Sequence, residues 1–280
     1  MNKILSLFLV TLLLVSCKEK TTNNPSPKSE SNNSNHVISD FQKIIDREKL
    51  TGCILILDVA SGQYYSNDFD LAKEGHLPAS TFKIPNSIIG LELGLLKDEN
   101  TLFKWDSLKR AAKVWEADLV LSEAFKLSCV PCYQEMARNI GVVQMNKKLA
   151  ELTYGQMDVD STTIDDFWLK GSSKITAFQQ IDFLWRMLHQ QLKISDSTYQ
   201  TMRRIMEIEV TGTYKLSGKT GWYEVNDSDH GWFVGFIEKG ESTYIIATHL
   251  DRPENTDVNA FYLGRKDLSL EACRIMNFID

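Results

Sequence analysis

The stretch PASTFKIPNSIIGLELGLL, residues 78–96, decides the fold that we expect for this chain. Apolar side chains are so dense after Ser80 that the pattern predicts a helix over residues 80–96, buried on most of its sides. Pro85 falls early enough to be tolerated, because the amides of the first turn have no acceptor within the helix. A separation of three residues puts the Ser80 hydroxyl and the Lys83 amine on one face. The stretch therefore predicts a nucleophile beside a base.

Strand patterns precede and follow this helix along the chain. The apolar, β-branched run 52–60 and residues 63–66 flank Ser61-Gly62, which predicts a hairpin. Later strands are expected at 213–218, 231–238 and 243–250, with Gly240 in the last turn. Helices are expected at 144–152, at 177–191, at 197–207 with Ser197 as N-cap, and at 271–278. We therefore predict an α/β (α+β) fold, in which helices flank an antiparallel sheet built from remote segments and a helical subdomain is inserted.

The first residues are expected to export and anchor the chain. Lys3 precedes the apolar run from Ile4 to Val15, which is too short to span a bilayer as an ordinary transmembrane helix. The following Ser16-Cys17 completes a sequence that resembles a bacterial lipobox, whose cysteine is lipidated; a plain signal peptide with an incidental cysteine is the alternative. We predict a lipoprotein signal peptide over 1–17, with a lipid on Cys17 that holds the exported protein at the periplasmic face of a bacterial membrane.

A polar segment and a globular domain follow the predicted anchor. Residues 18–35 contain only Thr, Asn, Ser, Pro, Lys and Glu, so they cannot bury apolar surface and are predicted to form a flexible tether. Residues 36–280 are predicted to form one continuous domain, because 43% of the chain is hydrophobic and no internal repeat or further low-complexity segment interrupts it.

Charge argues against a nucleic-acid partner. The chain has 31 basic and 37 acidic residues, a net charge of −6, and no basic stripe that could follow a phosphate backbone.

The cysteines and histidines do not indicate a metal. Without Cys17, the even number of cysteines that remains permits disulfides in an exported protein, but their pairing cannot be read from the sequence: Cys53, Cys129, Cys132 and Cys273. Half a zinc site or a redox pair are alternatives for Cys129-x-x-Cys132, yet no second CxxC or histidine pair accompanies it. The histidines lack metal spacing and a G-x-S-x-G partner, so we expect them to be structural or surface residues.

Two further motifs follow Ser80-x-x-Lys83 along the chain. They are Ser128-Cys129-Val130 and Lys219-Thr220-Gly221, the second at the end of a predicted strand. Taken alone, Ser128 is a turn hydroxyl, Lys219 belongs to a solvated strand end, and Ser80-x-x-Lys83 is a capped helix with a surface lysine. Together and in this order, the three motifs indicate a penicillin-recognising serine enzyme.

The motifs and their surroundings resemble the class D, oxacillinase-type serine β-lactamases of the penicillin-binding, transpeptidase-like superfamily. Residues 78–87 and the segment Gly231-Trp232-Phe233-Val234-Gly235-Phe236 carry the resemblance, which extends from about His36 to Phe278. Ser128-x-Val130 distinguishes the chain from class A enzymes, which have Ser-Asp-Asn. Tyr154-Gly155-Gln156 stands where the family has Tyr-Gly-Asn, so Gln156 departs from the pattern.

The resemblance implies that Lys83 is carboxylated by carbon dioxide or bicarbonate, with no other cofactor. A free lysine has a pKa of about 10.4, so its amine must be desolvated to react; the apolar groups expected to do this are Phe82, Val130, Trp168 and Leu169. By the same resemblance, the indole N–H of Trp168 holds the carbamate, although an ordinary core tryptophan is the alternative. The carbamate would then serve as the general base for acylation of Ser80 and for deacylation.

The remaining site residues are also carried over from the resemblance. The backbone N–H groups of Ser80 and Trp222 form the expected oxyanion hole, and Ser128 passes a proton to the leaving nitrogen. The residues expected to bind the substrate, including its carboxylate, are Val130, Lys219, Thr220, Gly221 and Arg265; Arg252, nearby, competes with Arg265 for its role. The expected function is hydrolysis of penicillin-type antibiotics, which confers resistance.

Two other functions share this serine chemistry. A DD-peptidase acts on peptidoglycan, but would more often carry Ser-x-Asn where this chain has Ser128-x-Val130. A β-lactam sensor stays acylated, and we expect it to be joined to transmembrane helices and a signalling domain. An inactive lipoprotein is a third possibility, against which the intact Ser80 and Lys83 argue. Whether carbapenems are substrates, whether the protein is a monomer or a homodimer, and which membrane holds it stay open.

Overall fold

The computed structural model describes residues 35–280, so the predicted signal peptide, Cys17 and nearly all of the predicted tether lie outside the described residues. Asn35, which we assigned to the tether, is the first residue of strand β1. Among the described residues, no helix is both long and apolar enough to span a bilayer.

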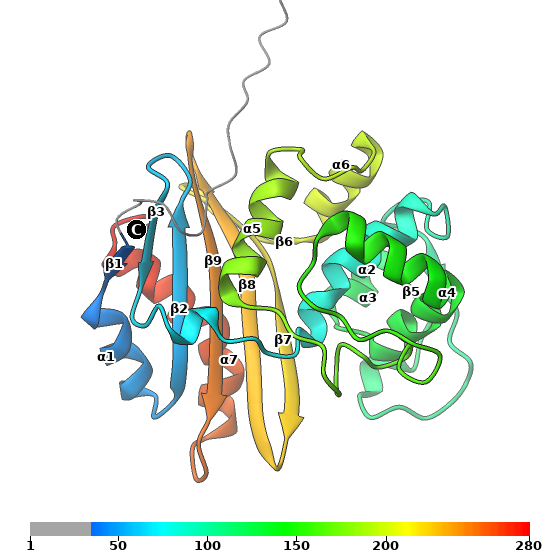
Figure 1. The fold of residues 1–280 in the computed structure, drawn as a ribbon, viewed down its shortest axis with the longest axis horizontal. Helices are drawn as coiled ribbons and strands as arrows, with labels where there is room; N and C mark the ends of the chain where they lie inside the picture. Colours follow the sequence, from blue (N-terminus) through cyan, green and yellow to red (C-terminus); the bar gives the residue numbers. More distant parts are fainter. Residues whose placement is uncertain (1–34) are drawn as a thin grey trace, which may run out of the picture.

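A seven-stranded sheet forms the centre of the molecule, in the order β1-β3-β2-β9-β8-β7-β6 (Figure 1). Its strands in chain order are β1 (Asn35–Val37), β2 (Thr51–Asp58), β3 (Gln63–Ser66), β6 (Glu207–Val210), β7 (Lys215–Val225), β8 (Ser228–Lys239) and β9 (Ser242–Arg252). The short β1 runs parallel to β3, and the other neighbouring strands of the sheet are antiparallel. The sheet therefore joins the first strands of the domain directly to the last, as the sequence predicts.

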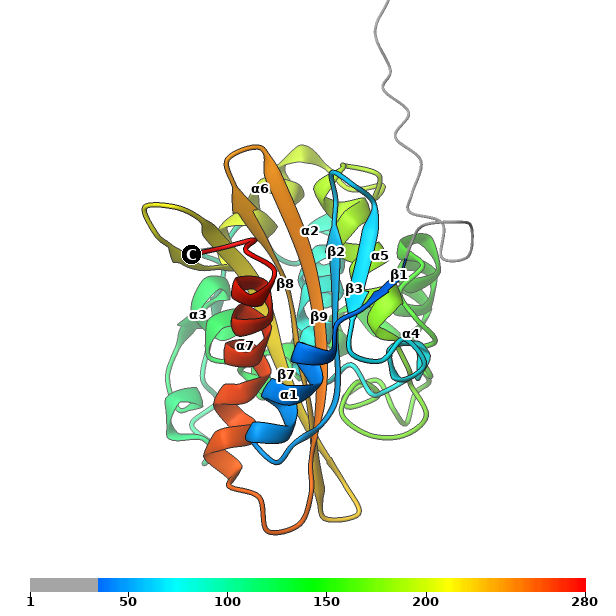
Figure 2. The same cartoon turned by 90° about the vertical axis from the view of Figure 1, so that its left-hand side faces the viewer.

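Helices cover both faces of the sheet. Figure 2 shows α1 (Ser39–Arg47) and α7 (Val258–Ile275) across one face. Helix α5 (Ala177–Leu188) packs on the other face, against β2, β8 and β9. On β2, Ile54 and Ile56 point into the first layer, and Leu55 and Leu57 into the second. Because both faces are buried, the strand reads as a continuous apolar run rather than an alternating one.

The helical subdomain lies beside β7 and is inserted between β3 and β6 (Figure 1). It contains α2 (Lys83–Glu92), α3 (Leu121–Lys126), α4 (Val130–Leu152) and α6 (Asp196–Ile205). The short strands β4 (Leu102–Phe103) and β5 (Leu119–Val120) pair within it, and single 3-10 turns occur at Leu71–Lys73, Ala79–Phe82 and Lys113–Trp115. Helix α2 contacts both α4 and α6, so the segment that begins at Lys83 is the core of the subdomain.

The predicted hairpin and the turn at Gly240 are confirmed, whereas several boundaries are wrong. The helix expected over 80–96 divides into a 3-10 turn over Ala79–Phe82 and α2, which ends where Gly94 has a φ of 71°. Ser195, not Ser197, caps α6: its Oγ accepts from the Thr198 amide at 3.3 Å.

Three other elements are longer than predicted. The helix expected at 144–152 begins at Val130 as α4, and non-helical backbone at Gly141 (φ 73°) interrupts its periodicity. The helix expected at 271–278 overlaps only the last part of α7, which starts at Val258 after the Asp257 cap and ends at Ile275. Strand β7 runs on to Val225, because a turn at Asn226-Asp227, both with positive φ, joins it to β8.

Candidate active site

Ser80 and Lys83 lie next to each other at the junction of the sheet and the helical subdomain. Ser80 is in the 3-10 turn, and Lys83 opens α2 one turn later. The Lys83 amine donates to Ser80 Oγ at 3.2 Å, and the two residues are only 1% and 7% exposed. Burial, aided by the positive charge of Lys219, lowers the pKa of Lys83 well below its usual range. The arrangement can thus hold an uncharged amine against a hydroxyl nucleophile.

The surroundings of Lys83 are aromatic. Its Nζ lies 4.7 Å from the ring centroid of Tyr133, a residue of α4 that the motifs did not indicate. The hydroxyl of Tyr133 is 2.8 Å from Ser87 Oγ, which fixes the ring against α2. The ring adds to the burial that favours the neutral amine, although its π face by itself would attract an ammonium ion. The only sequence signal for Tyr133 was its position one turn after Val130.

Trp168 is completely buried beside the nucleophile turn. Its ring is stacked on Phe82 at 5.5 Å between centroids, and its carbonyl accepts from the Ala79 amide at 2.8 Å. Its indole N–H has no hydrogen-bond partner among the described residues. A buried donor without an acceptor is costly, so this N–H is available to an anionic group. A carboxylated Lys83 would supply such an acceptor, and the residues present fit it.

Ser128 and Lys219 form a second hydroxyl–amine pair. Ser128 lies between α3 and α4 with a φ of 54°, and Lys219 Nζ donates to its Oγ at 2.6 Å. Lys219 also donates to its neighbour's carbonyl, Thr220 O, at 3.0 Å. Burial, together with the positive charge of Arg265, lowers the pKa of Lys219 to about 7. Near neutral pH this pair can therefore hold or release a proton.

Gly221 allows β7 to lie directly against the nucleophile turn. A Cβ at this position would stand 3.1 Å from Pro78 O and 3.3 Å from the Ala79 side chain. The absence of a side chain at Gly221 therefore lets the Lys-Thr-Gly segment lie next to the nucleophile turn without a tight contact. Trp222 follows it; the residue is 46% exposed, and its indole N–H donates to Asp229 at 2.7 Å. The backbone N–H groups of Ser80 and Trp222 remain the predicted oxyanion hole.

The two arginines that competed for the carboxylate role have different partners. Arg265 is 3% exposed on α7, and its guanidinium donates to the carbonyls of Gly221 and Tyr262. Burial lowers its pKa to about 10, so it stays cationic at neutral pH. Arg252 instead binds the Asp229 carboxylate at 2.6 Å. Arg265 is thus the arginine in contact with the Lys-Thr-Gly segment.

Tyr154 is connected to the nucleophile turn through Gln180. The Tyr154 hydroxyl donates to Gln180 at 3.3 Å, and Gln180 donates to Thr81 Oγ1 at 3.0 Å, next to Ser80. Gln156, which departs from the family pattern, is exposed and pairs through its backbone with Lys174, so its side chain is outside this network. Val130 is half-buried as the first residue of α4.

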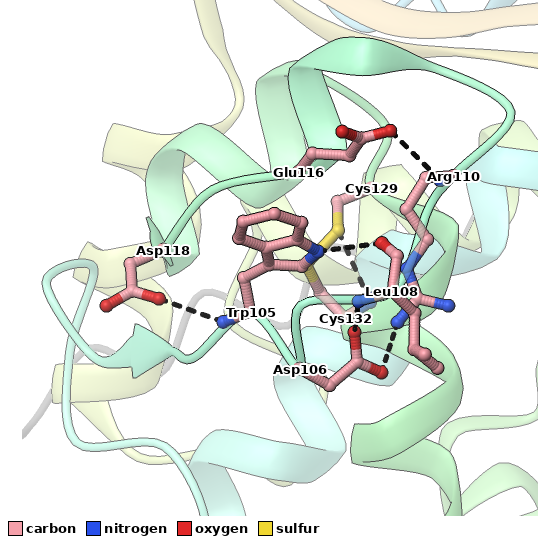
Figure 3. Close-up of polar contacts among 8 residues, drawn as sticks. All are labelled: Trp105, Asp106, Leu108, Arg110, Glu116, Asp118, Cys129 and Cys132. Carbon is pink, nitrogen blue, oxygen red and sulfur yellow. Dashed lines mark hydrogen bonds and ion pairs between the residues drawn. A yellow bond between two sulfur atoms is a disulfide. The ribbon is translucent and has the colours of Figure 1, made fainter.

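A disulfide joins Cys129 and Cys132 on either side of the Val130-Pro131 pair. The disulfide lies next to the indole ring of Trp105 (Figure 3). Trp105 belongs to a separate loop, which hydrogen bonds hold in place. In that loop Trp105 donates to Leu108 O at 2.9 Å, and Arg110 pairs with Asp106. The disulfide identifies the partners that the sequence left open, whereas Cys53 and Cys273 are buried, free thiols.

Comparisons with known proteins agree with this architecture. The family model that matches is the penicillin binding protein transpeptidase domain, over residues 12–263. The chain is 38% identical to β-lactamase OXA-48 of Klebsiella pneumoniae over 73% of this chain and 77% of that one. It is also 38% identical to β-lactamase OXA-10 of Pseudomonas aeruginosa, over 76% and 81%.

Solved structures give the same result. The class D β-lactamase of Sebaldella termitidis superimposes with a TM-score of 0.84 at 34% identity, covering 89% of this chain and all (100%) of that one. FUS-1 (OXA-85), a class D β-lactamase of Fusobacterium nucleatum, gives a TM-score of 0.82 at 32% identity, over 88% and 100%. The fold and the site are those of the penicillin-recognising, transpeptidase-like serine enzymes. Within that class, the chain belongs to the class D serine β-lactamases.

Proposed function

We propose that the chain hydrolyses penicillin-type β-lactams through an acyl-enzyme on Ser80, with a carboxylated Lys83 as the general base for both half-reactions. One observation carries the proposal: the buried Lys83 amine lies 3.2 Å from Ser80 Oγ in a site where Trp168 has an unpartnered indole N–H. When carboxylated, Lys83 would supply an anionic base that an ordinary lysine ammonium cannot provide. Carbon dioxide or bicarbonate is the only cofactor that we propose.

The reaction begins at Ser80. Its Oγ loses a proton towards position 83 and attacks the strained lactam carbonyl, and the backbone N–H groups of Ser80 and Trp222 stabilise the negative charge on the carbonyl oxygen. The C–N bond of the ring then breaks, and the nitrogen receives a proton from Ser128. Lys219, 2.6 Å from Ser128 Oγ, replaces that proton. Position 83 then gives up its proton to solvent, and Lys219 regains one from solvent. Water finally transfers a proton to position 83 and attacks the ester carbonyl, and that proton passes to Ser80 Oγ as Ser80 is released.

The substrate carboxylate is proposed to lie at the Lys-Thr-Gly segment. Lys219, Thr220 and Arg265 bring two cations and a hydroxyl to the same region, because Arg265 donates to Gly221 O. Gly221 keeps the strand close to Ser80, and Val130 with the exposed Trp222 ring would contact the apolar parts of the substrate.

The cellular setting is proposed from the sequence alone. We infer that the signal peptide 1–17 directs export, that lipid on Cys17 anchors the protein at the periplasmic face, and that hydrolysis there confers β-lactam resistance.

The test is turnover of a chromogenic cephalosporin by the purified chain, with and without added bicarbonate. We expect repeated turnover that bicarbonate raises or sustains. Stoichiometric labelling of Ser80 by a penicillin without turnover would favour a sensor instead. Cleavage of a D-Ala-D-Ala peptide without turnover of any β-lactam would favour a DD-peptidase.

A further inference from the structure

Two histidines and an aspartate gather on one face of the sheet, beyond the Lys-Thr-Gly segment. His230 of β8 stands directly opposite Asp251 of β9 in the strand register. His249 is two residues before Asp251, so its side chain is on the same face. That face also carries Trp232, which belongs to the core under the helical subdomain. None of the three residues has a role in the proposed serine chemistry.

The donor atoms of the cluster are close enough to share one ion. His230 Nδ1 lies 2.5 Å, and His249 Nδ1 3.7 Å, from Asp251 Oδ1, and one ligand atom from each residue falls within 4.8 Å of the others. Tetrahedral zinc, with bonds of about 2.0–2.2 Å to nitrogen and oxygen, separates its ligand atoms by about 3.3 Å. The two distances to Asp251 lie on either side of that value, and the largest separation in the cluster is within 4.8 Å, so shifts of about 1–1.5 Å would form the site.

Asp251 lacks a permanently charged partner. Across residues 35–280 its ion-pair partners are the two imidazoles, and no lysine or arginine pairs with it. Arg252 follows it in the chain but points to the other face of the strand, where it binds Asp229. A partly buried carboxylate between two imidazoles can accept a hydrogen bond from an imidazole N–H, or it can share a metal ion with the two rings.

The surroundings hold the imidazoles in place, as metal sites require. His249 Nε2 is 3.2 Å from the Tyr223 hydroxyl, which leaves Nδ1 facing Asp251. Its ring is stacked under His76 at 3.7 Å between centroids. A hydrogen bond on the far nitrogen of a ligating histidine is the usual outer support of such sites. The side chains of His230 and Asp251 are 23% and 35% exposed, so an ion can enter from solvent.

We propose that His230, His249 and Asp251 form a binding site for one divalent transition-metal ion, best matched by Zn²⁺, with water in the fourth position. Two imidazoles and a carboxylate with one open position are a ligand set that zinc accepts, whereas Mg²⁺ and Ca²⁺ prefer oxygen ligands alone. The site would join the ends of β8 and β9 and so stabilise the sheet next to Trp222. The spacing of histidines along the sequence did not indicate it, because two ligands are two residues apart on one strand and the third is on its neighbour.

The test is calorimetric titration of Zn²⁺ into the full chain after removal of metals with a chelator, paired with the visible absorption of bound Co²⁺. We expect one ion per chain, a raised thermal midpoint, and the strong visible bands of tetrahedral Co²⁺. His230→Phe should weaken Zn²⁺ binding by about a hundredfold or more, beyond the 10–100-fold typical of an outer-sphere change.

A control variant at another stacked histidine distinguishes the loss of a metal ligand from the loss of ring stacking. His230 is stacked on Tyr223 at 5.0 Å, and His36, on β1 at the far edge of the sheet, is stacked on Tyr65 at 5.2 Å. Phenylalanine preserves either stack, so His36→Phe should leave zinc binding unchanged. The metal-free thermal midpoint of each variant shows whether it folds. Cys17 is present in the wild-type chain and in both variants, so any binding of Zn²⁺ to Cys17 would be the same with and without His230.

Two results would overturn the proposal. One is the absence of saturable Zn²⁺ binding to the full chain, and the other is binding that His230→Phe leaves intact. Asp251 would then accept hydrogen bonds from the imidazoles, and the cluster would be a hydrogen-bond network without a metal.

Discussion

Lys219 Nζ donates to Ser128 Oγ at 2.6 Å, although the two residues are 91 positions apart in the chain. The contact joins β7 of the sheet to the turn between α3 and α4, and so holds the helical subdomain against the strand that carries the Lys-Thr-Gly segment. It also connects a lysine whose pKa is about 7 to the hydroxyl that we propose as the proton donor. The same hydrogen bond thus positions the site and provides a route for a proton.

Replacing Ser128 should slow acylation. In Ser128→Ala the lactam nitrogen would leave without its proton donor, and general acid catalysis of this kind contributes about 10²–10⁴-fold. We expect kcat/KM for a penicillin to fall within that range while the fold is retained. Ser197→Ala, an exposed serine of α6, is the control and should show wild-type kinetics. A Ser128→Ala enzyme with unchanged kcat/KM would remove this residue from the proton route.

Stability should rise with pH between about 7 and 9. The folded-state pKa of Lys219 is about 7, below the unfolded value of about 10.4, so over this interval the unfolded chain binds more protons than the folded one. The free energy of unfolding then increases with pH, by at most about 1.4 kcal/mol per pH unit for each such group. The folded-state pKa of Lys83 is also lowered, so Lys83 contributes to the same increase in the free energy of unfolding with pH.

Denaturant unfolding across this pH interval measures the slope. Lys219→Met should reduce it, because one of the two buried amines is gone. Burial raises the folded-state pKa values of the Cys53 and Cys273 thiols. Above about pH 9 these thiols therefore make the free energy of unfolding fall with pH, so the prediction is limited to pH 7–9. A stability that is flat from pH 7 to 9 would show that the two amines keep ordinary pKa values in the folded chain.

Trp168→Phe should make activity depend on added bicarbonate. The phenyl ring preserves packing on Phe82, but the unpartnered indole N–H is lost, so a carbamate at Lys83 would decompose more readily. We expect low turnover without bicarbonate and partial recovery with it. Trp232→Phe is the control, because that buried indole donates to Leu77 O and has no place in the site chemistry. An equal bicarbonate response in both variants would argue against the role of Trp168.

Reducing the Cys129–Cys132 disulfide should destabilise the fold only modestly. The bridge closes a very short loop, for which the chain-entropy model gives about 2 kcal/mol. We expect a thermal midpoint a few degrees lower in reductant, and a loss of the same size in Cys132→Ala without it. A reduced enzyme as stable as the oxidised one would show that the bridge does not restrain the start of α4.

The sequence predicted the elements whose signals are local. Ser80 and Lys83 are three residues apart, so their contact followed from spacing, and the strands before and after them followed from continuous apolar runs. Two of the boundaries that were wrong depend on single residues whose backbone departs from the pattern. Gly94 ends α2, and Gly141 interrupts α4.

Contacts between remote segments could not be predicted in this way. The ring of Tyr133 beside Lys83, the choice of Arg265 over Arg252 and the pairing of Cys129 with Cys132 depend on how helices and strands meet in space. Asp229 binds both Arg252 and Trp222, and no sequence spacing relates these three residues to a common site.

The most direct measurement is the ¹³C NMR spectrum of the protein in ¹³C-labelled bicarbonate, recorded with turnover on the same sample. We predict one carbamate signal that is absent from Lys83→Ala, is unaffected in Lys126→Ala at an exposed lysine, and declines together with turnover as the pH is lowered. A fully active enzyme with no carbamate signal, or a Lys83→Ala variant that hydrolyses β-lactams at the wild-type rate, would contradict the account.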